Sequence, residues 1–150
     1  MKNASPGAPD LSALSLTSAF HGRLFGSLSL TRSKAIHKID IPAFDWPVAP
    51  FPKLQYPLDR YAKENAQEEK RCLDEVERII VEWKAKKPVA ALIIEPVQSE
   101  GGDNHASNEF FQGLRDVTKV SKGGATNSAR AQILLTNSSN LSETWRISHR

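Results

Sequence analysis

Cysteine is nearly absent from this sequence of 150 residues, since Cys72 is the only one. A single cysteine excludes an internal disulfide bond and any metal cluster held by cysteines, so Cys72, inside a helical pattern, is expected to be a structural thiol. The four histidines show no metal-ligand spacing, and we expect no metal site. No apolar run approaches the roughly 20 residues of a membrane-spanning helix, so no membrane partner is expected.

A strong excess of one charge is also missing. The chain has 20 Lys and Arg against 17 Asp and Glu, a net charge of +3 at pH 7. These charges are spread along the chain, without a basic patch in which aromatic residues are interleaved, so we expect no nucleic-acid partner. The N-terminal MKNASPGAPD has neither the apolar stretch of a secretory signal nor the arginine-rich pattern of a transit peptide. A cytoplasmic location is therefore expected.

The first part of the chain predicts a strand followed by a helix. Residues 11–19 form an apolar run of strand length, expected to be buried. Residues 22–33 predict a helix in which Leu24, Phe25 and Leu28, spaced by three and four, share one face.

The central part of the chain predicts a helix, a strand and a second helix. Residues 63–87 predict the longest helix, because apolar residues recur every three or four positions and charged residues fill the other side. This core-facing stripe consists of Leu73, Val76, Ile80 and Trp83. The run VAALIIEPV, residues 89–97, is typical of a parallel strand covered on both faces. Ser107 is predicted to cap an amphipathic helix over residues 108–120. The alternation predicts an α/β fold.

Two segments lack regular periodicity. Five prolines between residues 40 and 57 exclude a helix and an inner strand, so an extended loop is predicted. Its aromatic residues favour an ordered, packed loop over a flexible linker; they are Phe44, Trp46, Phe51 and Tyr56. The tail, residues 121–150, is rich in Ser, Asn and Thr, with one short apolar island at 133–135. We expect no buried strand there and a poorly ordered tail.

Two clusters of polar residues follow the predicted strands. In open α/β sheets, ligands bind beyond the carboxyl ends of the strands. Phe20 and Arg23 follow the first strand; the planar guanidinium suits a carboxylate, and the aromatic ring can lie flat on another ring. Glu95 ends the later strand, and Glu100 follows it by five residues, where it can neutralise an arginine when no anion is bound. The residues alone predict an anion-binding α/β fragment, although a lone arginine after a strand is more often a solvated charge.

Four longer segments have a more specific pattern. They are AFHGR, KAIHKIDIPAFDWPVAPFPKL, EEKRCLDEVE and EPVQSEGGDNHAS. Together they resemble the 4-aminobutyrate aminotransferases, a family in the class-III, ω-amino acid branch of the pyridoxal-phosphate-dependent transaminases, and the fungal members above all. The resemblance covers about residues 3–119. It implies a partial large domain of the fold-type-I pyridoxal-phosphate-dependent transferase fold, a three-layer α/β/α arrangement with an incomplete sheet over residues 1–120.

The resemblance implies roles for five residues. Phe20 resembles the aromatic residue that packs at the pyridoxal phosphate ring, with His21 beside it, and Glu95 resembles the strand-end glutamate near the cofactor. Arg23 resembles the arginine that binds the carboxylate of 4-aminobutyrate. Glu100 resembles the glutamate that pairs with a second arginine, which accepts the α-carboxylate of 2-oxoglutarate. The implied activity is 4-aminobutyrate:2-oxoglutarate transamination, by a full-length homodimer.

Three parts of the family pattern have no counterpart in these 150 residues. They are the phosphate-binding segment, the strand with the aspartate for the pyridine nitrogen, and the Schiff-base lysine. Lys122 follows a serine, as the Schiff-base lysine does. The strand with the aspartate should precede that lysine, however, and none does here, so we expect that Lys122 is not the Schiff-base lysine. We therefore expect a fragment truncated at both ends, without a catalytic residue of its own and inactive alone. Ser18 also departs from the pattern, which usually has glycine there.

Two other functions stay open. The chain could be a non-catalytic interaction protein that pairs with intact transaminase subunits. It could also belong to another ω-amino acid aminotransferase, such as one for ornithine, but the proline-rich loop argues against that reading. A changed reading frame, an unremoved intron or an alternative transcript would explain the polar tail.

Overall fold

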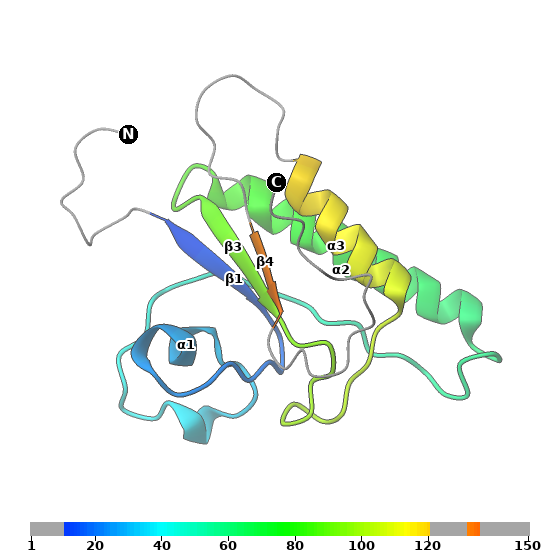
Figure 1. Cartoon of the computed structure of the whole chain (residues 1–150), viewed down its shortest axis with the longest axis horizontal. Coiled ribbons are helices and arrows are strands. Elements are labelled where there is room, and N and C mark those ends of the chain that lie inside the picture. Colours follow the sequence, from blue (N-terminus) through cyan, green and yellow to red (C-terminus); the bar gives the residue numbers. More distant parts are fainter. Residues whose placement is uncertain (1–10, 121–131, 136–150) are drawn as a thin grey trace.

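The computed structural model describes residues 11–120 and 132–135, which form a parallel sheet with helices packed against it (Figure 1). The strands are β1 (Ser12–Leu16), β2 (Val48–Ala49), β3 (Val89–Ile94) and β4 (Gln132–Leu135). They lie in the order β2-β1-β3-β4, and every neighbouring pair is parallel. The helices are α1 (Phe25–Leu30), α2 (Ala62–Trp83) and α3 (Asn108–Val120), with a 3₁₀ helix, η1 (Ala35–His37).

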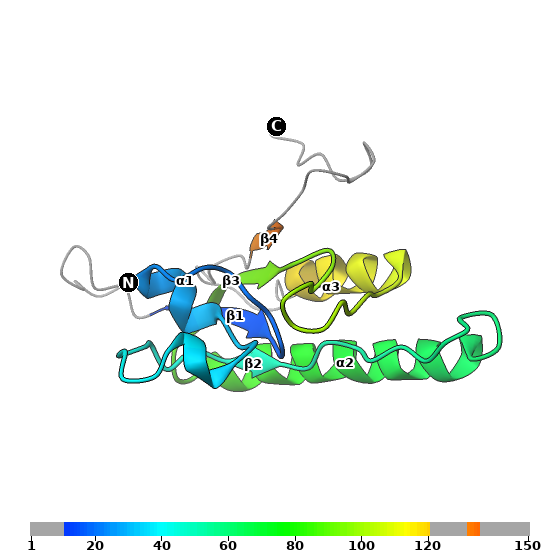
Figure 2. The ribbon, with the colours of Figure 1, turned by 90° about the horizontal axis from the view of Figure 1, so that it is seen from below.

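The hydrophobic core lies between the sheet and helices α2 and α3, which run side by side (Figure 2). Alternate residues of a strand point to the same face, so Leu14 and Leu16 of β1 enter this core together. Helix α2 contributes Val76 and Ile80 of the predicted stripe, and Leu73 and Trp83 pack against it. The stripe was therefore predicted correctly. The described residues thus form the sheet and the helix layer on one of its faces.

Cys72 belongs to the same core and is fully buried, which confirms the predicted structural thiol. Burial raises the pKa of its thiol to about 12. The thiol is therefore protonated at neutral pH and unreactive.

Helix α3 begins as predicted, and its cap also joins it to α2. The Phe110 N–H donates to Ser107 Oγ at 3.1 Å, which is the bond expected of an N-cap. The Ser107 hydroxyl in turn donates to Glu69 Oε2 at 2.6 Å, and the Ser107 N–H donates to Glu69 Oε1 at 2.7 Å. Glu69 is buried on α2, so its carboxylate fixes the start of α3 against the longer helix.

Helix α1 differs from its prediction. It spans only Phe25–Leu30, so the predicted bounds were wrong, and Leu24 is the residue before the helix instead of a member of its face. Leu24 and Phe25 are 82% and 54% exposed. Only Leu28 of the predicted face is buried. The chain leaves helical geometry at Thr31, whose side chain bonds to the Gly22 carbonyl instead of continuing a helix. Local polar contacts therefore override the apolar spacing.

The proline-rich segment is an extended loop, as predicted, and it is packed over residues 46–52, whereas residues 39–45, including Phe44, are exposed. Its residues Val48–Ala49 pair with β1 at an edge of the sheet, where proline is tolerated. Phe51 is 4% exposed and contacts Phe110, and the buried Asn65 bonds to both backbone groups of Gln55 at 2.8 and 2.9 Å. Tyr56, however, is 59% exposed, so the prediction that it helps to hold the loop was wrong.

Strand β4 corrects the prediction that no strand follows residue 120. Gln132–Leu135 pairs with β3 in parallel, with Ala91 opposite Gln132 and Ile94 opposite Leu135. The apolar island is short, but the exposed backbone groups of β3 require hydrogen-bond partners, and four residues supply them. The rest of the tail, for which disorder was predicted, lies outside the described residues.

Candidate functional site

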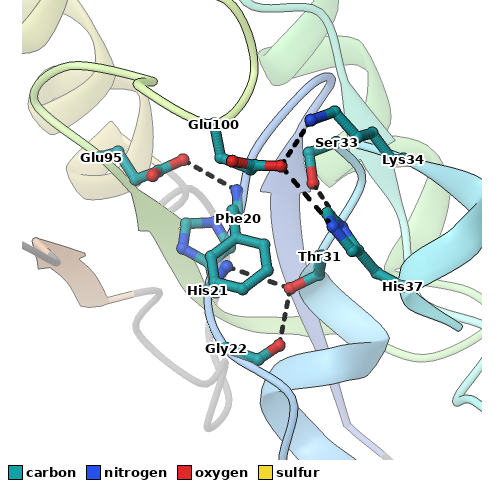
Figure 3. A network of polar contacts seen from close by, with 9 residues as sticks. All are labelled: Phe20, His21, Gly22, Thr31, Ser33, Lys34, His37, Glu95 and Glu100. Carbon is teal, nitrogen blue, oxygen red and sulfur yellow. Dashed lines mark hydrogen bonds and ion pairs between the residues drawn. The ribbon is translucent and has the colours of Figure 1, made fainter.

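The two predicted clusters meet at one edge of the sheet. Strands β1 and β3 are parallel neighbours, so their carboxyl ends lie together. The Phe20 N–H, after β1, donates to Glu95 Oε2, after β3, at 2.9 Å (Figure 3). This bond joins residues 75 positions apart and defines the centre of the site.

Glu95 is a buried carboxyl group, 2% exposed. Burial raises its pKa, because the ionised form loses hydration, and the hydrogen bond from Phe20 partly opposes this effect. Phe20 itself is only partly buried. The strand edge therefore combines a desolvated acid with an aromatic ring that solvent can still reach.

A short turn carries His21, Gly22 and Arg23 beyond β1. The buried hydroxyl of Thr31 accepts from the His21 N–H at 3.0 Å and donates to the Gly22 carbonyl at 2.9 Å (Figure 3). Gly22 has φ +108°, a conformation that favours glycine. Burial lowers the pKa of His21 to about 4, so its imidazole is neutral at pH 7.

Glu100 is held by two residues that the sequence analysis did not assign to the site. Lys34 Nζ lies 2.6 Å from Glu100 Oε1, and His37 Nε2 lies 3.6 Å from the same oxygen (Figure 3). The Lys34 contact, above all, lowers the pKa of Glu100, with smaller contributions from His37 and Arg23. Lys34 is the extended residue before the 3₁₀ helix and His37 is the last residue of that helix, so no helical spacing in the sequence indicates that both reach Glu100.

Arg23 lies at the exposed margin of the cluster. Its guanidinium is close enough to Glu100 to lower the pKa of that carboxyl. The structure therefore brings Phe20, Glu95 and Glu100 together, with Arg23 in their electrostatic range. The predicted neutralising partner of Glu100 was an arginine, whereas the cation in contact with it here is Lys34.

The turn that carries Glu100 is anchored to the end of β1. Gln98 is fully buried, and its amide donates to the Thr17 carbonyl at 2.9 Å. Asn104 donates to Gln98 Oε1 at 3.1 Å, which closes the turn on itself. Gly101 lies directly against the backbone of Ser18. These contacts fix the direction from which Glu100 approaches the site.

Residues 11–120 and 132–135 hold neither a metal-binding cluster nor a membrane-spanning helix. No group of three or more His, Cys, Asp or Glu side chains in this part of the chain could hold a metal ion. No helix within it is long and apolar enough to cross a membrane.

Known proteins resemble this chain closely in sequence. The 4-aminobutyrate aminotransferase of Emericella nidulans is 68% identical over 119 residues, and the mitochondrial enzyme of that name from Homo sapiens is 63% identical over 120 residues. Each alignment covers 79% of this chain but 24% of the relative. The chain thus spans about a quarter of the length of these curated relatives.

Solved structures and a family comparison agree with these relatives. A lysine aminotransferase from M. tuberculosis has 30% identity and a TM-score of 0.67, over 83% of this chain and 26% of that protein. The described residues thus form a partial α/β domain of the pyridoxal-phosphate-dependent aminotransferase type. Residues 6–122 match the class-III aminotransferases. The chain therefore belongs to the class-III aminotransferase family.

Proposed function

We propose that this chain is part of a 4-aminobutyrate:2-oxoglutarate aminotransferase and forms one wall of its active site. The observation that carries the proposal is the convergence of Phe20, Glu95 and Glu100 at the carboxyl edge of the sheet. Relatives 62–68% identical to the chain are named 4-aminobutyrate aminotransferase, which supports this substrate. The proposed enzyme acts as a homodimer on 4-aminobutyrate and 2-oxoglutarate.

Class-III aminotransferases use pyridoxal phosphate, which supplies the electron sink for amine transfer when it is bound. Three residues at this edge suit its ring. Phe20 presents a partly exposed aromatic ring, and His21 next to it carries no charge at pH 7 that would repel a cationic ring nitrogen. Glu95 holds the Phe20 backbone in place and would offer a carboxyl group to the bound cofactor. We assign these residues to orientation of the cofactor.

Arg23 and Glu100 are assigned to the substrates. The exposed guanidinium of Arg23 can form two parallel hydrogen bonds with the carboxylate of 4-aminobutyrate, which orients the amino group toward the cofactor. Glu100 already pairs with a cation in this structure. In the complete enzyme, we propose that Glu100 pairs with a second arginine. That arginine would leave Glu100 to bind the α-carboxylate of 2-oxoglutarate, so the partner of Glu100 would change between the two half-reactions.

Substitution of Arg23 tests this assignment in the complete polypeptide that contains the chain. Arg23→Lys keeps the charge but removes the planar fork, and we expect the KM for 4-aminobutyrate to rise about 10- to 100-fold. The control is Arg78→Lys, on the exposed face of α2, where Arg78 pairs only with Glu75 and Glu82 among the described residues. Equal KM values for both variants would remove Arg23 from the substrate site.

A second test uses a polypeptide of these 150 residues alone. None of its residues matches the family's Schiff-base lysine in sequence context, so we expect it to form no glutamate from 4-aminobutyrate, 2-oxoglutarate and added pyridoxal phosphate. Glutamate production is measured by a coupled dehydrogenase assay, together with cofactor absorbance. Glutamate formation that is lost in Lys122→Ala would show that Lys122 supplies this function, contrary to our expectation.

A further inference from the structure

His37 lies between two residues of the site and contacts both of them. Its ring packs edge-on against Phe20, with centroids 5.2 Å apart and planes at 75°. Its Nε2 lies 3.6 Å from Glu100 Oε1, and its Nδ1 lies 3.0 Å from Ser33 Oγ (Figure 3). The side chain is 8% exposed, so these neighbours define its surroundings.

The polar contacts of His37 have a consistent direction. Ser33 Oγ can donate to Nδ1, which places the ring proton on Nε2, the atom that faces Glu100. A carboxylate only accepts hydrogen bonds, so this tautomer suits Glu100. With this tautomer the ring turns its Nε2–H toward Glu100, at 3.6 Å, which is an electrostatic contact longer than a hydrogen bond.

Packing alone does not explain this arrangement. An edge-on aromatic pair accounts for the contact with Phe20, and phenylalanine at position 37 would make it equally well. Both ring nitrogens of His37, however, face polar partners from different segments, one on its own turn and one 63 positions further along the chain. Among the residues that the structure describes, the other cations that act on Glu100 are Lys34, on the same oxygen, and Arg23.

We propose that His37 is a positioning residue of this site, which holds the Phe20 ring by its edge and directs the carboxylate of Glu100 through Nε2. The roles of Phe20 and Glu100 rest on the proposed function, whereas the contacts of His37 do not. Lys34 supplies most of the charge that holds Glu100, and His37 sets the direction of the carboxylate. A change at His37 should therefore alter Glu100 and Phe20 together.

Three substitutions in the full chain separate these contacts. His37→Gln places an amide N–H near the position of Nε2, His37→Asn keeps a polar group near Ser33 only, and His37→Phe keeps only the ring. Each is studied by NMR with ¹³C-labelled glutamate carboxyl groups and labelled Phe20. Lys34→Met is the positive control, since Lys34 is the largest cause of the low pKa of Glu100. Amide signals of α2 and α3, remote from His37, report whether each variant is folded.

We expect the pKa of Glu100 to shift upward in His37→Asn and His37→Phe but to remain in place in His37→Gln. We also expect a nuclear Overhauser contact between the rings of His37 and Phe20. In His37→Phe, the ring of the new phenylalanine should make the same contact with Phe20. A Glu100 pKa that all three substitutions leave unchanged, while Lys34→Met moves it, would overturn the proposal. The absence of the ring contact in the parent chain would do the same.

A kinetic measurement in the complete polypeptide provides an independent arm. His37→Phe and His37→Asn are expected to raise the KM for 2-oxoglutarate about two- to tenfold, with His37→Gln restoring it toward the parent value. Parent-like kinetics in His37→Phe, with a raised KM in His37→Gln and His37→Asn, would assign His37 a packing role and contradict the proposal. A parent without transaminase activity would contradict the proposed function instead, and the NMR titration would still decide the contacts of His37.

Discussion

Replacing Gly101 by alanine is expected to lower the free energy of unfolding of the chain by about 3 kcal/mol or more. An alanine Cβ at this position would overlap the carbonyl oxygen of Ser18 and lie 3.0 Å from the Ser18 Cβ. Neither backbone can move away easily. Ser18 has φ +63°, and the neighbouring Thr17 carbonyl is bonded to the buried amide of Gln98. The overlap therefore has to displace the turn that carries Glu100.

Gly26→Ala is the matched control for this prediction. Gly26 lies inside helix α1, and a Cβ there meets no other atom within 4 Å. Alanine favours a helix over glycine, so this variant is expected to gain up to about 1 kcal/mol. Urea denaturation of the parent and both variants, followed by circular dichroism, measures the difference. Equal midpoints for Gly101→Ala and Gly26→Ala would show that the turn does not pack against Ser18 as described.

The close approach of Gly101 to Ser18 illustrates what sequence patterns leave out. The resemblance to the family implies a glycine where this chain has Ser18, but the sequence gives no reason for a glycine there. The reason is the left-handed backbone at this position, where glycine is not strained and most other residues are. Spacing reveals neither a backbone angle nor a contact between residues 83 positions apart.

Long periodic elements were predicted well, and short ones were not. Helices α2 and α3 and strand β3 have apolar patterns that repeat over many residues, so local sequence determines them. Helix α1 and strand β4 have six and four residues, and their extent depends on tertiary contacts. Thr31 ends α1 by bonding to Gly22, and β4 forms because β3 has a free edge. The spacing of apolar residues in the sequence indicates neither of these contacts.

One topological rule explains why the two candidate clusters lie at the same edge of the sheet. Parallel neighbouring strands bring their carboxyl ends together, and Phe20, after β1, contacts Glu95, after β3. Lys34 and His37 were missed, because a lysine and a histidine in a mixed-charge segment resemble solvated side chains. The contacts of Lys34 and His37 with Glu100 depend on the path of the chain between α1 and the proline-rich loop, because that path places both side chains next to Glu100.

Acid is expected to destabilise the folded chain through His21. Its pKa is about 4 in the folded chain, against an ordinary value of 6.5. Between these values the unfolded chain binds a proton at His21 and the folded chain does not, so stability falls as pH falls. The loss at His21 begins below about pH 6.5 and reaches up to about 3 kcal/mol near pH 4. His21→Gln removes this titration and should flatten the profile.

Two carboxyl groups of the site also titrate in acid. The pKa of Glu95 is raised, so its protonation favours the folded chain as pH falls and opposes the effect of His21. The pKa of Glu100 is lowered, so its contribution is lost only below its ordinary value of 4.5. Comparison with His21→Gln cancels both carboxyl groups, because both variants retain them.

The control for His21 is His105→Gln, since His105 is exposed in the turn before α3. Urea denaturation at several pH values between 7.5 and 4.5 gives the three profiles. As pH falls, the free energy of unfolding should decrease in parallel for the parent and His105→Gln. It should decrease less for His21→Gln, so the difference between this variant and the parent should change in favour of the variant. Parallel profiles for the parent and His21→Gln would mean that the imidazole accepts a proton in the folded state. A cation would then stand beside Phe20, and the neutral surface assigned to the cofactor ring would have to be abandoned.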